Sequence, residues 1–513
     1  MKHSLKIEPM GVALSVEHGT SLFEALKSCG VAFPCGGKGI CGNCRVRLLA
    51  GRVARSEEHE SMCRKKGLPA DWCLACFSHV DEDLVIEVPD GLMAIQTDTS
   101  AADVCSDEEG CGVAVDLGST TVVVQLVDLK SGKVLAERSG LNPQGIYGAD
   151  VISRIAYAME GDENLCRLRD LIRGYLKEQI EELAGGCPEA DIRKVRIVGN
   201  TVMHHLFAGY DVSCLGRAPF HSSRNGRCRF TPAGLGWKLP EECTIEFFPN
   251  ISHFVGSDIL AGIVACGMHE SEECSLLVDL GTNGEMAIGS REGIWCTSTA
   301  AGPAFEGINI SCGMRASAGA VCTVGCRSGR IVVSTIGGTE PRGICGSGLV
   351  EAVHCFLKQG WIDSSGMFLS DDADAVTLAP GVTLTAADIR EFQLAKAAIA
   401  TGIRILLERS SLTPDAIAHV YLTGGLGNYV DRDKVVQLGL LPGIRSERCV
   451  KLPNAALAGC KRMLYDACGR KAEEILERVT YCPLESDPRF MDLYCDNLFF
   501  PGSDADVNTN TNV

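Results

Sequence analysis

Apolar and polar residues alternate in short runs along the first part of the chain, which is typical of β-strands that bury one face. Four such runs, SLKIEP, VALSVEH, CRVRLL and LVIEVP, lie near or within residues 1–88, and a short helical pattern, SLFEALKSCG, separates the second from the third. Cysteine-rich loops connect these runs. We therefore predict a small β-rich domain over residues 1–88.

The pattern changes after this domain. Residues 89–110 are polar and acidic and have no sustained period, so we predict a linker there. From Gly112 onward, apolar strands alternate with helical stretches, which indicates an α/β fold. We divide this region into a subdomain over residues 111–272, a subdomain over 273–470, a segment over 471–501 that returns to the core, and a disordered tail over 502–513.

The α/β region contains an internal repeat. The sequence GVAVDLGSTTVVVQLVD begins at Gly112, and SLLVDLGTNGEMAIGS begins at Ser275. Both copies place Val-Asp-Leu-Gly-Ser/Thr at the end of a strand, followed by a small polar turn and a second strand. A chance match is one explanation, but the shared strand–turn–strand context favours duplication of a subdomain. The repeated aspartates are Asp116 and Asp279.

Composition and charge exclude some classes of function. A chain of 513 residues is too long for one hydrophobic core, so several domains are expected. A net charge of −17 argues against nucleic acid or anionic membranes as partners, and leaves either a solubilising acidic surface or a docking face for a basic partner. We find no signal-peptide pattern and no apolar run long enough to span a membrane. The 27 cysteines are therefore expected to be thiols or metal ligands in a reducing cytoplasm.

Cysteines and glycines crowd into the stretch CGGKGICGNC at residues 35–44. The spacing of the cysteines there, with another further on, is similar to the C-x4-C-x2-C…C ligand pattern of plant-type [2Fe–2S] clusters, with one extra residue in the loop. Glycines let such a loop curl inward, so that backbone N–H groups converge on the negative charge of the cluster. Residues 1–88 are then an electron-transfer module whose candidate ligands are Cys35, Cys41, Cys44 and Cys76.

A zinc ribbon is the alternative for the same region. Cys41 and Cys44 form one C-x2-C pair, and Cys73 and Cys76 form another, a spacing that tetrahedral zinc sites also use. Zinc needs no glycine-rich loop and would leave Cys35 without a role, so [2Fe–2S] is favoured, with zinc or no metal left open. In the favoured interpretation the spare thiols near the loop are Cys29, Cys63 and Cys73.

The duplicated aspartate turns supply groups that bind a nucleoside triphosphate. A triphosphate needs backbone donors for its phosphate oxygens and carboxylates for Mg²⁺ and its waters. No G-x4-G-K-[ST] motif occurs, so a P-loop is not expected. Each turn instead presents N–H and hydroxyl donors beside one carboxylate, and the strand HVYLTGGLGN at residues 419–428 contains a glycine pair against which adenine and ribose can lie. Any one of these is also an ordinary glycine turn, but the three in this order favour a nucleotide site.

With these three elements, the α/β region resembles the acetate-and-sugar-kinase/Hsp70/actin superfamily, in which two duplicated subdomains close around ATP. The resemblance implies phosphate loops at Asp116–Thr121 and Asp279–Glu285, and an adenosine loop at Gly424–Asn428. With the cysteine loop of residues 1–88, the expected fold is an α+β, ferredoxin-like β-grasp domain followed by a duplicated α/β actin/Hsp70-like ATPase domain. The implied nucleotide contacts are Gly118, Ser119, Thr120, Thr121, Gly281, Thr282, Asn283, Gly284, Glu285, Gly424, Gly425, Gly427 and Asn428.

Further segments narrow the resemblance to one family. Together with the ferredoxin-like domain in front, they are similar to the reductive activators of corrinoid proteins. The segments are VGNTVMH at 198–204, AAGPAFEG at 300–307, CGMRA at 312–316, GICGSGL at 343–349, LAKAAI at 394–399 and NLFFP at 497–501. Longer members of that family carry a further domain where only residues 89–110 stand here. The family's dimer contacts are therefore not carried over, and a homodimer is left open.

The resemblance implies an ATP-dependent activator that passes low-potential electrons from a [2Fe–2S] cluster to the inactive Co(II) corrinoid of a methyltransferase partner, giving Co(I). It implies that an electron donor reduces the cluster, and that Asp116 and Asp279 orient Mg²⁺ and the attacking water. Glu306 either helps to polarise this water or is a structural hydrogen-bond acceptor. His204 and His205 are either core histidines or groups that approach cobalt in the partner.

Two other functions remain open on the sequence. The ATPase part also resembles activators of other low-potential enzymes, such as 2-hydroxyacyl-CoA dehydratases, although those activators lack a ferredoxin domain and hold a [4Fe–4S] cluster between subunits. The other is a small-molecule kinase with an ancillary redox sensor. A phosphorylated product would favour the kinase, whereas ATP hydrolysis stimulated by a Co(II) corrinoid protein would favour the activator.

Overall fold

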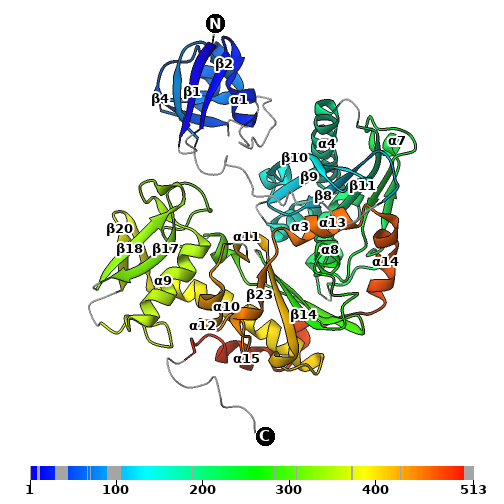
Figure 1. Ribbon diagram of the computed structural model, residues 1–513, viewed down its shortest axis with the longest axis vertical. Helices are drawn as coiled ribbons and strands as arrows, with labels where there is room; N and C mark the ends of the chain where they lie inside the picture. The colour runs from blue at the N-terminus through cyan, green and yellow to red at the C-terminus, as the bar shows by residue number, and fades with distance from the viewer. Residues whose placement is uncertain are drawn as a thin grey trace.

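The structure is a computed structural model (Figure 1). It describes residues 2–8, 12–28, 44–65, 68–69, 71–88, 106–148, 150–187, 190–218, 220–281, 283–307, 309–327, 329–370, 374–427 and 429–501. Several features predicted from the sequence lie outside the described residues, namely Cys29, Cys35, Cys41, Thr282, Asn428, most of the linker and the tail over 502–513.

The N-terminal domain contains a five-stranded mixed sheet with the order β2-β1-β7-β4-β5 (Figure 1). Strand β1 lies between β2 and the central strand β7, and it pairs antiparallel with β2 and parallel with β7. Helix α1 buries Leu22 and Leu26 in the same core as Leu5 and Ile86. The four strands and the helix predicted for this region are present. Their bounds are β1 Lys2–Glu8, β2 Val12–Glu17, α1 Leu22–Ser28, β4 Arg45–Ala50, β5 Trp72–Leu74 and β7 Leu84–Glu87.

A second helix of this domain, α2 (Glu57–Lys65), has no counterpart in the sequence prediction because its sequence is mostly charged. Ser56 starts it by accepting hydrogen bonds from His59 N and Glu60 N. The helix buries the His59 ring, whose Nε2 accepts a hydrogen bond of 3.0 Å from Leu74 N. One buried polar contact therefore attaches this helix to strand β5.

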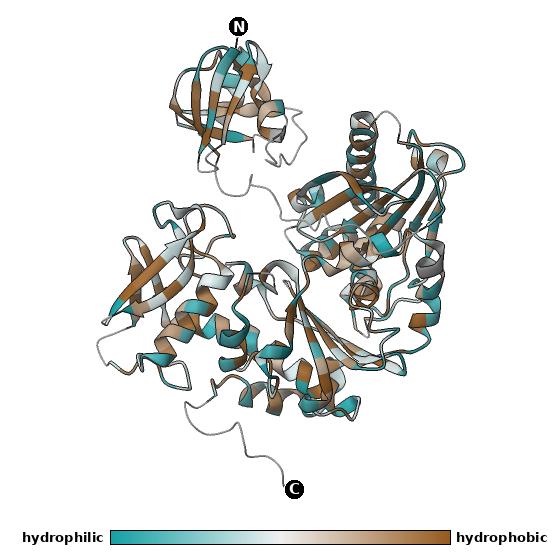
Figure 2. Ribbon diagram, viewed as in Figure 1, coloured by the Kyte–Doolittle hydropathy of each residue, from teal (hydrophilic) through white to brown (hydrophobic). Residues whose placement is uncertain are grey.

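The first half of the α/β region is a six-stranded sheet with the order β10-β9-β8-β11-β13-β12. Val113 and Val115 of β8 pack on the side of helices α4 and α5, whereas Ala114 between them belongs to a different core on the opposite face. Both faces are covered, which explains the nearly continuous apolar strands (Figure 2). The bounds are β8 Cys111–Leu117, β9 Thr121–Asp128, β10 Val134–Leu141, α3 Val151–Met159, α4 Asp162–Gly186, β11 Ile192–Gly199, α5 Thr201–Ala208, β12 Cys228–Phe230 and β13 Thr244–Phe247.

The second half is another six-stranded sheet, with the order β23-β22-β14-β15-β16-β24. Helix α10 packs against β15 and β16 and begins at a capping box formed by Thr385 and Asp388. The bounds are β14 Cys274–Leu280, β15 Gly284–Ser290, β16 Gly293–Thr299, α9 Gly346–Lys358, α10 Ala386–Arg409, β22 Ile417–Thr423, α11 Gly424–Gly427, β23 Cys449–Lys451 and β24 Val479–Tyr481.

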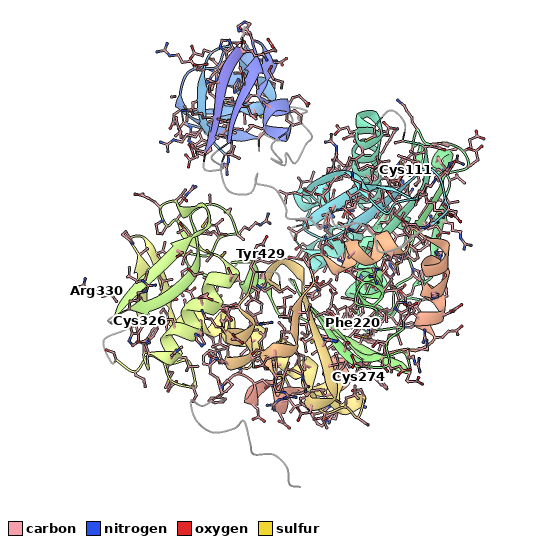
Figure 3. The ribbon with its side chains drawn as sticks, in the orientation of Figure 1. Cys111, Phe220, Cys274, Cys326, Arg330 and Tyr429 are labelled. Carbon is pink, nitrogen blue, oxygen red and sulfur yellow. The ribbon has the colours of Figure 1, made fainter. Side chains whose placement is uncertain are left out.

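The two sheets repeat the same arrangement, as the sequence repeat predicts. In each, the first strand pairs antiparallel with the next strand and parallel with a later one: β8 with β9 and β11, and β14 with β15 and β22. Cys111 and Cys274 begin the equivalent strands β8 and β14 (Figure 3). Duplication therefore explains both the repeated sequence and the repeated strand order.

Helices α8 (Ser257–Ala265) and α13 (Ala455–Arg462) cross at the junction of the two halves. A Cβ atom at Gly459 would lie 1.8 Å from Ala261 O, so the backbones are in contact at the crossing. The core around this crossing contains residues from both sheets, including Ala114 and Leu277. The two halves are thus joined through one continuous hydrophobic core.

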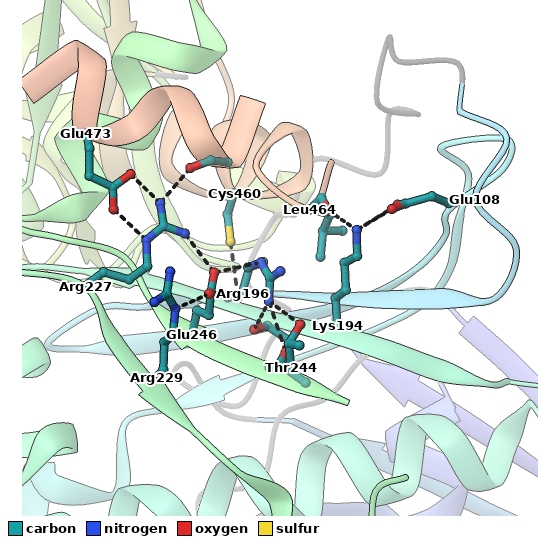
Figure 4. A network of polar contacts seen from close by, with 12 residues as sticks. Glu108, Lys194, Arg196, Arg227, Arg229, Thr244, Glu246, Cys460, Leu464 and Glu473 are labelled. Carbon is teal, nitrogen blue, oxygen red and sulfur yellow. Dashed lines mark hydrogen bonds and ion pairs between the residues drawn. The ribbon is translucent and has the colours of Figure 1, made fainter. Parts of the chain in front are cut away.

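The end of the chain packs on both halves. Strand β24 pairs in parallel with β16 of the second sheet, and helix α14 (Asp466–Leu476) is bound to the first sheet by Arg227 (Figure 4). The Arg227 guanidinium donates two hydrogen bonds of 2.7 Å to Glu473, one of 2.7 Å to Glu246 and one of 2.6 Å to Gly469 O.

A smaller lobe of the second half extends toward the N-terminal domain. It contains β17 (Ala320–Arg327), β18 (Arg330–Thr335) and β19 (Gly343–Ile344), with β20 (Ala375–Ala379) and β21 (Val382–Thr385) beside them. Arg342 of this lobe forms an ion pair of 3.7 Å with Glu87 of the N-terminal domain. Across the described ranges, none of the helices combines the length and the apolar character that crossing a bilayer requires.

Candidate functional site

The first aspartate turn connects β8 to β9. Asp116 is the penultimate residue of β8, and Leu117 pairs with Val122, so residues 118–121 form the turn. Gly118 is required there, because a Cβ atom would lie 2.7 Å from Thr121 O. Asn142 Nδ2 donates to Gly118 O at 2.9 Å, so the turn is fixed from behind by a buried amide.

The second turn connects β14 to β15 in the same way. Asp279 is the penultimate residue of β14, and Leu280 pairs with Gly284 across the turn. Gly281 and Asn283 lie in this turn, whereas Thr282 is outside the described residues. Glu285, the second residue of β15, is only 9% exposed and pairs with Asp279 across the strands. The structure thus brings a second carboxylate to this turn.

Four carboxylates meet where the two halves join. They are Asp116, Asp258, Asp279 and Glu285, and we call them the carboxylate cluster. Burial raises the pKa of Asp116 to about 6, although a hydrogen bond from Asn454 opposes the shift. Burial, and then the charge of Asp116, raise the pKa of Asp258 to about 7.

In the remaining two members of the carboxylate cluster, the charges of neighbouring members also raise the pKa values. Burial, then Asp258 and Asp116, raise the pKa of Asp279 to about 7. Burial, then Asp258 and Asp279, raise the pKa of Glu285 well above its ordinary value. Carboxylates that disfavour each other's charge at one place are a recurrent feature of sites that bind cations or transfer protons. Cation binding would relieve this repulsion.

Asp258 was missed in the sequence prediction. It lies in the first turn of α8, outside both aspartate turns, and its Oδ1 accepts a hydrogen bond of 2.9 Å from Ile259 N. The sequence feature that could have identified this helix is a second, shorter repeat. The segment ILAGI at 259–263 in α8 corresponds to ALAGC at 456–460 in α13. These two helices start at the carboxylate cluster, and their repeated sequence indicates that both belong to the site.

Asn454 was also missed. It caps α13 by accepting from Leu457 N at 2.8 Å, and its Nδ2 donates to Asp116 Oδ2 at 2.9 Å. The backbone of Asn454 is left-handed, with φ +35°, which asparagine tolerates better than most residues. A residue of the second half therefore contacts the first aspartate turn directly.

The predicted adenosine loop lies against the second aspartate. Strand β22 ends at Thr423, and Gly424 turns the chain with φ +82° into α11. A Cβ atom at Gly424 would lie 2.2 Å from Asp279 Oδ1, so only glycine fits. Tyr429 follows the loop and is 43% exposed (Figure 3), while Asn428 is outside the described residues. No neighbour lies within 4 Å of a Cβ placed at Gly425, whereas at Gly427 it would meet the backbone of β22.

Glu306 lies near the predicted adenosine loop, whereas the two histidines lie in the core. Glu306 is half-buried and ends the 3₁₀ turn Pro303–Glu306, which packs against α11. His204 and His205 are fully buried, with His205 hydrogen bonded to Thr201 O and Ser222 Oγ. Burial lowers the pKa of His204 to about 3. Both histidines are core residues, the first of the two interpretations left open by the sequence.

The carboxylate cluster does not form a complete metal cage. In the described ranges, no group of three or more histidine, cysteine, aspartate or glutamate residues has the geometry to hold a metal ion. Mg²⁺ usually keeps several waters and is bound through one or two carboxylates together with substrate phosphates. Carboxylates beside the two aspartate turns therefore suit Mg²⁺ that arrives with a nucleotide.

Two of the four candidate cluster cysteines are described, and they come together. Cys44 Sγ lies 2.9 Å from Cys76 Sγ, with Cys44 buried and Ala75 N donating to Cys44 O at 2.8 Å. Two thiolate sulfurs that converge from separate segments suit the ligand set of an iron–sulfur cluster. Cys63 and Cys73 are buried in the domain core, and burial raises the pKa of Cys73 to about 11, which disfavours its thiolate.

Family models cover all three parts of the chain. The model described as 2Fe-2S iron-sulfur cluster binding domain matches residues 5–81. The RACo middle region matches residues 111–271, and the C-terminal domain of RACo, the ASKHA domain, matches residues 273–512. A relative, the corrinoid activation enzyme RamQ of Eubacterium limosum, is 35% identical over 424 residues, which cover 76% of this chain and 70% of the relative. The chain belongs to the RACo family.

Two more relatives agree with this family. The [Co(II) methylated amine-specific corrinoid protein] reductase of Methanosarcina barkeri is 28% identical over 69% of this chain and 70% of its own length. The solved structure of the reductive activator for corrinoid,iron-sulfur protein is 27% identical, covers 98% of this chain and 99% of its own, and superposes with a TM-score of 0.67. The predicted fold, a ferredoxin-like domain before a duplicated ASKHA domain, is confirmed, and the matches support a [2Fe–2S] cluster and ATP binding.

Proposed function

We propose that this RACo-family protein is an ATP-dependent reductive activator. It passes low-potential electrons from a [2Fe–2S] cluster to the inactive Co(II) corrinoid of a methyltransferase partner and gives Co(I). The carboxylate cluster carries the proposal, because it lies where the two halves of a duplicated ATPase fold meet, in a chain that also has a ferredoxin-like domain. Relatives described as a corrinoid activation enzyme and as a Co(II) corrinoid protein reductase support it.

The proposal assigns a role to each part of the chain. Residues 1–88 hold the [2Fe–2S] cluster, and residues 89–110 link this domain to the ATPase. Residues 111–272 and 273–470 are the two halves that bind the nucleotide between them, and residues 471–501 return to the core. Cys35, Cys41, Cys44 and Cys76 hold the cluster, which supplies single electrons at about −400 mV in plant-type domains.

The nucleotide is bound between the two aspartate turns in this proposal. Asp116 and Asp279 orient Mg²⁺ and its waters, and Asp258 joins them because its charge is connected to both. The predicted contacts of the two turns and of the adenosine loop bind the phosphates and the adenosine. Glu306 is retained as a structural acceptor, the second interpretation of that residue.

ATP is needed because the electron transfer is uphill. The Co(II)/Co(I) couple of a corrinoid is more negative than a plant-type cluster, and each ~59 mV of shortfall costs about tenfold in equilibrium for one electron. Nucleotide binding that closes the two halves stabilises the state with the corrinoid partner bound. The free energy that nucleotide binding contributes to the electron transfer cannot exceed the difference in nucleotide-binding free energy between the open and closed states. The free energy of hydrolysis is added if hydrolysis is coupled.

Anaerobic reduction of the partner tests the proposal. Full-length protein with a reductant, ATP and a Co(II) corrinoid protein is expected to produce the absorbance of Co(I) and to hydrolyse ATP faster than without the partner. Asp116→Ala should abolish both while the visible spectrum of the iron–sulfur cluster stays intact. Asp211→Ala is the matched control, because Asp211 lies in the same half and only bonds the turn at Ser213. Normal cobalt reduction by Asp116→Ala, or a phosphorylated small molecule as product, would contradict the proposal.

A further inference from the structure

Arg154 is a buried cation directly behind the first aspartate turn. It lies on helix α3 and is only 1% exposed. Its Nη2 donates to Ser119 O at 2.6 Å, and its Nε donates to Gly148 O at 2.9 Å. Nη1 lies 3.4 Å from Gln144 Oε1. Every one of these acceptors is a neutral oxygen.

No carboxylate is hydrogen bonded to this cation within the part of the chain that the structure describes. Burial lowers the pKa of Arg154 to about 10, and the charge of Asp150, the exposed N-cap of α3, opposes the shift from a distance, because its Oδ1 is used to cap Ser153 N. The side chain therefore stays charged at neutral pH. A buried charge with no carboxylate in direct contact is costly and is rarely kept for stability alone.

The contacts of Arg154 and Asn142 set the direction of the turn. The carbonyl of Ser119 points toward Arg154, and the carbonyl of Gly118 points toward Asn142. In a planar trans peptide the N–H points opposite to the C=O. The N–H groups of Thr120 and Ser119, which share these two peptides, therefore point away from the buried side chains.

This arrangement makes the turn an anion-binding element with a fixed cation behind it. Successive N–H groups that point the same way form a site for a phosphate oxygen. Asn200 Nδ2 adds to it by donating to Ser119 Oγ at 2.8 Å, which leaves the Ser119 hydroxyl hydrogen available as a further donor. The Arg154 guanidinium contacts the carbonyl oxygen of the Ser119–Thr120 peptide, and the phosphate would lie on the opposite side of this peptide, at its N–H.

We propose that Arg154 is a positioning residue for the phosphates of the nucleotide: it fixes the Ser119 carbonyl, so that the turn presents its N–H groups, and it supplies the positive charge that the phosphates neutralise. It acts through the turn and does not touch the nucleotide. This inference rests on the proposed function only in that the chain binds an adenine nucleotide.

The test separates phosphate recognition from folding. The Kd of ADP and that of adenosine are measured by competition against a fluorescent ADP analogue, with the full-length holoprotein. Arg154→Met is expected to weaken ADP about 10- to 100-fold, the loss that removal of a charge-assisted hydrogen bond gives, and to change adenosine less than about twofold. Arg154→Lys, which keeps the charge but not the planar fork, is expected to lie between Met and wild type.

Arg173 provides the matched control. It is a partly buried arginine of the same half whose Nε and Nη2 donate to Phe207 O and Ala208 O, away from the turn. Arg173→Met and Arg173→Lys should leave the ratio of the ADP and adenosine affinities unchanged. If Arg154→Met does not fold, Arg154→Lys against Arg173→Lys still decides the question.

Three outcomes are distinguishable. Weaker ADP with unchanged adenosine in the Arg154 variants supports the inference. Equal weakening of both ligands, or no weakening of either, overturns it and leaves the proposed function intact. Wild-type protein that binds neither ADP nor ATP contradicts the proposed function itself, and the role of Arg154 with it.

Discussion

The Nδ2 atom of Asn454 donates a hydrogen bond of 2.9 Å to Oδ2 of Asp116, and this bond joins the second half of the ATPase to the first aspartate turn. The same side chain caps α13, one of the two helices that cross at the junction. Any ligand that changes the charge or position of Asp116 therefore acts on the start of this helix. The bond also stabilises the ionised form of Asp116, which burial opposes.

Asn454→Gly should shift the pH dependence of the ATPase to higher pH. Loss of the amide removes a donor to the carboxylate, so the pKa of Asp116 is expected to rise further above about 6. Glycine keeps the left-handed backbone and the cap position, so the free energy of unfolding should fall mainly through loss of the bond to Asp116, by about 1.5–3 kcal/mol. The measurement is the pH midpoint of activity together with urea unfolding. Asp431→Gly, which removes the cap of helix α12 (Arg432–Gln437), is the control and should leave the midpoint unchanged.

Binding of Mg²⁺ with a nucleotide should strengthen as pH rises. The pKa values of Asp116, Asp258 and Asp279 are raised to about 6, 7 and 7, so these groups are protonated in mild acid and must ionise to bind the cation. Affinity for Mg·ADP measured by calorimetry is expected to increase between about pH 5.5 and 7.5. A flat profile over this range would contradict the electrostatic account of the cluster.

The same carboxylates predict the opposite slope for stability without ligand. A carboxyl whose folded pKa is raised stabilises the fold fully below its unfolded value of 3.8, and this contribution is lost as pH rises through about 6 to 7. Asp258→Asn removes one repulsive charge, so the apo protein should lose less stability over this range and should bind Mg·ADP more weakly. Urea unfolding at pH 5 and pH 8 measures the first effect, with Asp211→Asn as the control.

Gly424→Ala should abolish nucleotide binding. The new Cβ atom would lie 2.2 Å from Asp279 Oδ1, and the backbone at φ +82° is strained for alanine by about 1–2 kcal/mol. The adenosine loop and the second aspartate therefore cannot both keep their positions. Gly381→Ala has a similar φ of +77° but no atom within 4 Å, so it tests the strain alone and should bind ADP normally. Equal ADP affinity in the two variants would show that the close approach at Gly424 is not needed.

Arg227→Met should destabilise the protein far more than Glu473→Gln. Arg227 bonds Glu246, which is 9% exposed, and Arg196 and Arg229 are that carboxylate's other cations. Removing one partner of a buried pair costs about 3–5 kcal/mol when the other charge is left uncompensated. Because Arg196 and Arg229 stay beside Glu246, the cost of losing Arg227 should fall below that range. It should still include the loss of the bonds to α14, among them the bond to Gly469 O. Glu473 is half-exposed, so its loss should cost at most about 1 kcal/mol. Thermal unfolding compares the two variants, and similar losses would contradict the role given to Glu246.

The repeat in the sequence predicted the main part of the fold and contains three of the four cluster carboxylates, Asp116, Asp279 and Glu285. Asp116 and Asp279 were found because each lies near the end of an apolar strand, in a copy of the same motif, and precedes a turn of small residues. Asp258 and Asn454 were missed because each lies at the start of a helix, where aspartate and asparagine are common caps with no wider role. The shorter repeat in α8 and α13 hints that the two helices are equivalent, and their crossing brings these two residues to the candidate site.

Other parts of the structure could not be predicted because their signals are not local. Helix α2 has a mostly charged sequence and depends on a buried histidine for its attachment. Arg154 reads as an ordinary helix residue in the sequence, and its importance comes from long-range burial against a turn that precedes it by many residues. The order of the five equivalent strands, in contrast, follows from duplication once one copy is recognised, whereas the sixth strands, β12 and β24, lie at opposite edges of their sheets.

The backbone contact between Gly459 and Ala261 determines how the two halves are able to move. No side chain separates α8 from α13 at this contact, so the two backbones touch over a small area. Sliding the two helices apart would open a gap in the hydrophobic core that both halves share. Rotation about this point keeps the contact. A rotation about this contact would move the tip of the β17–β18 lobe more than any part close to the contact, because displacement grows with distance from the axis.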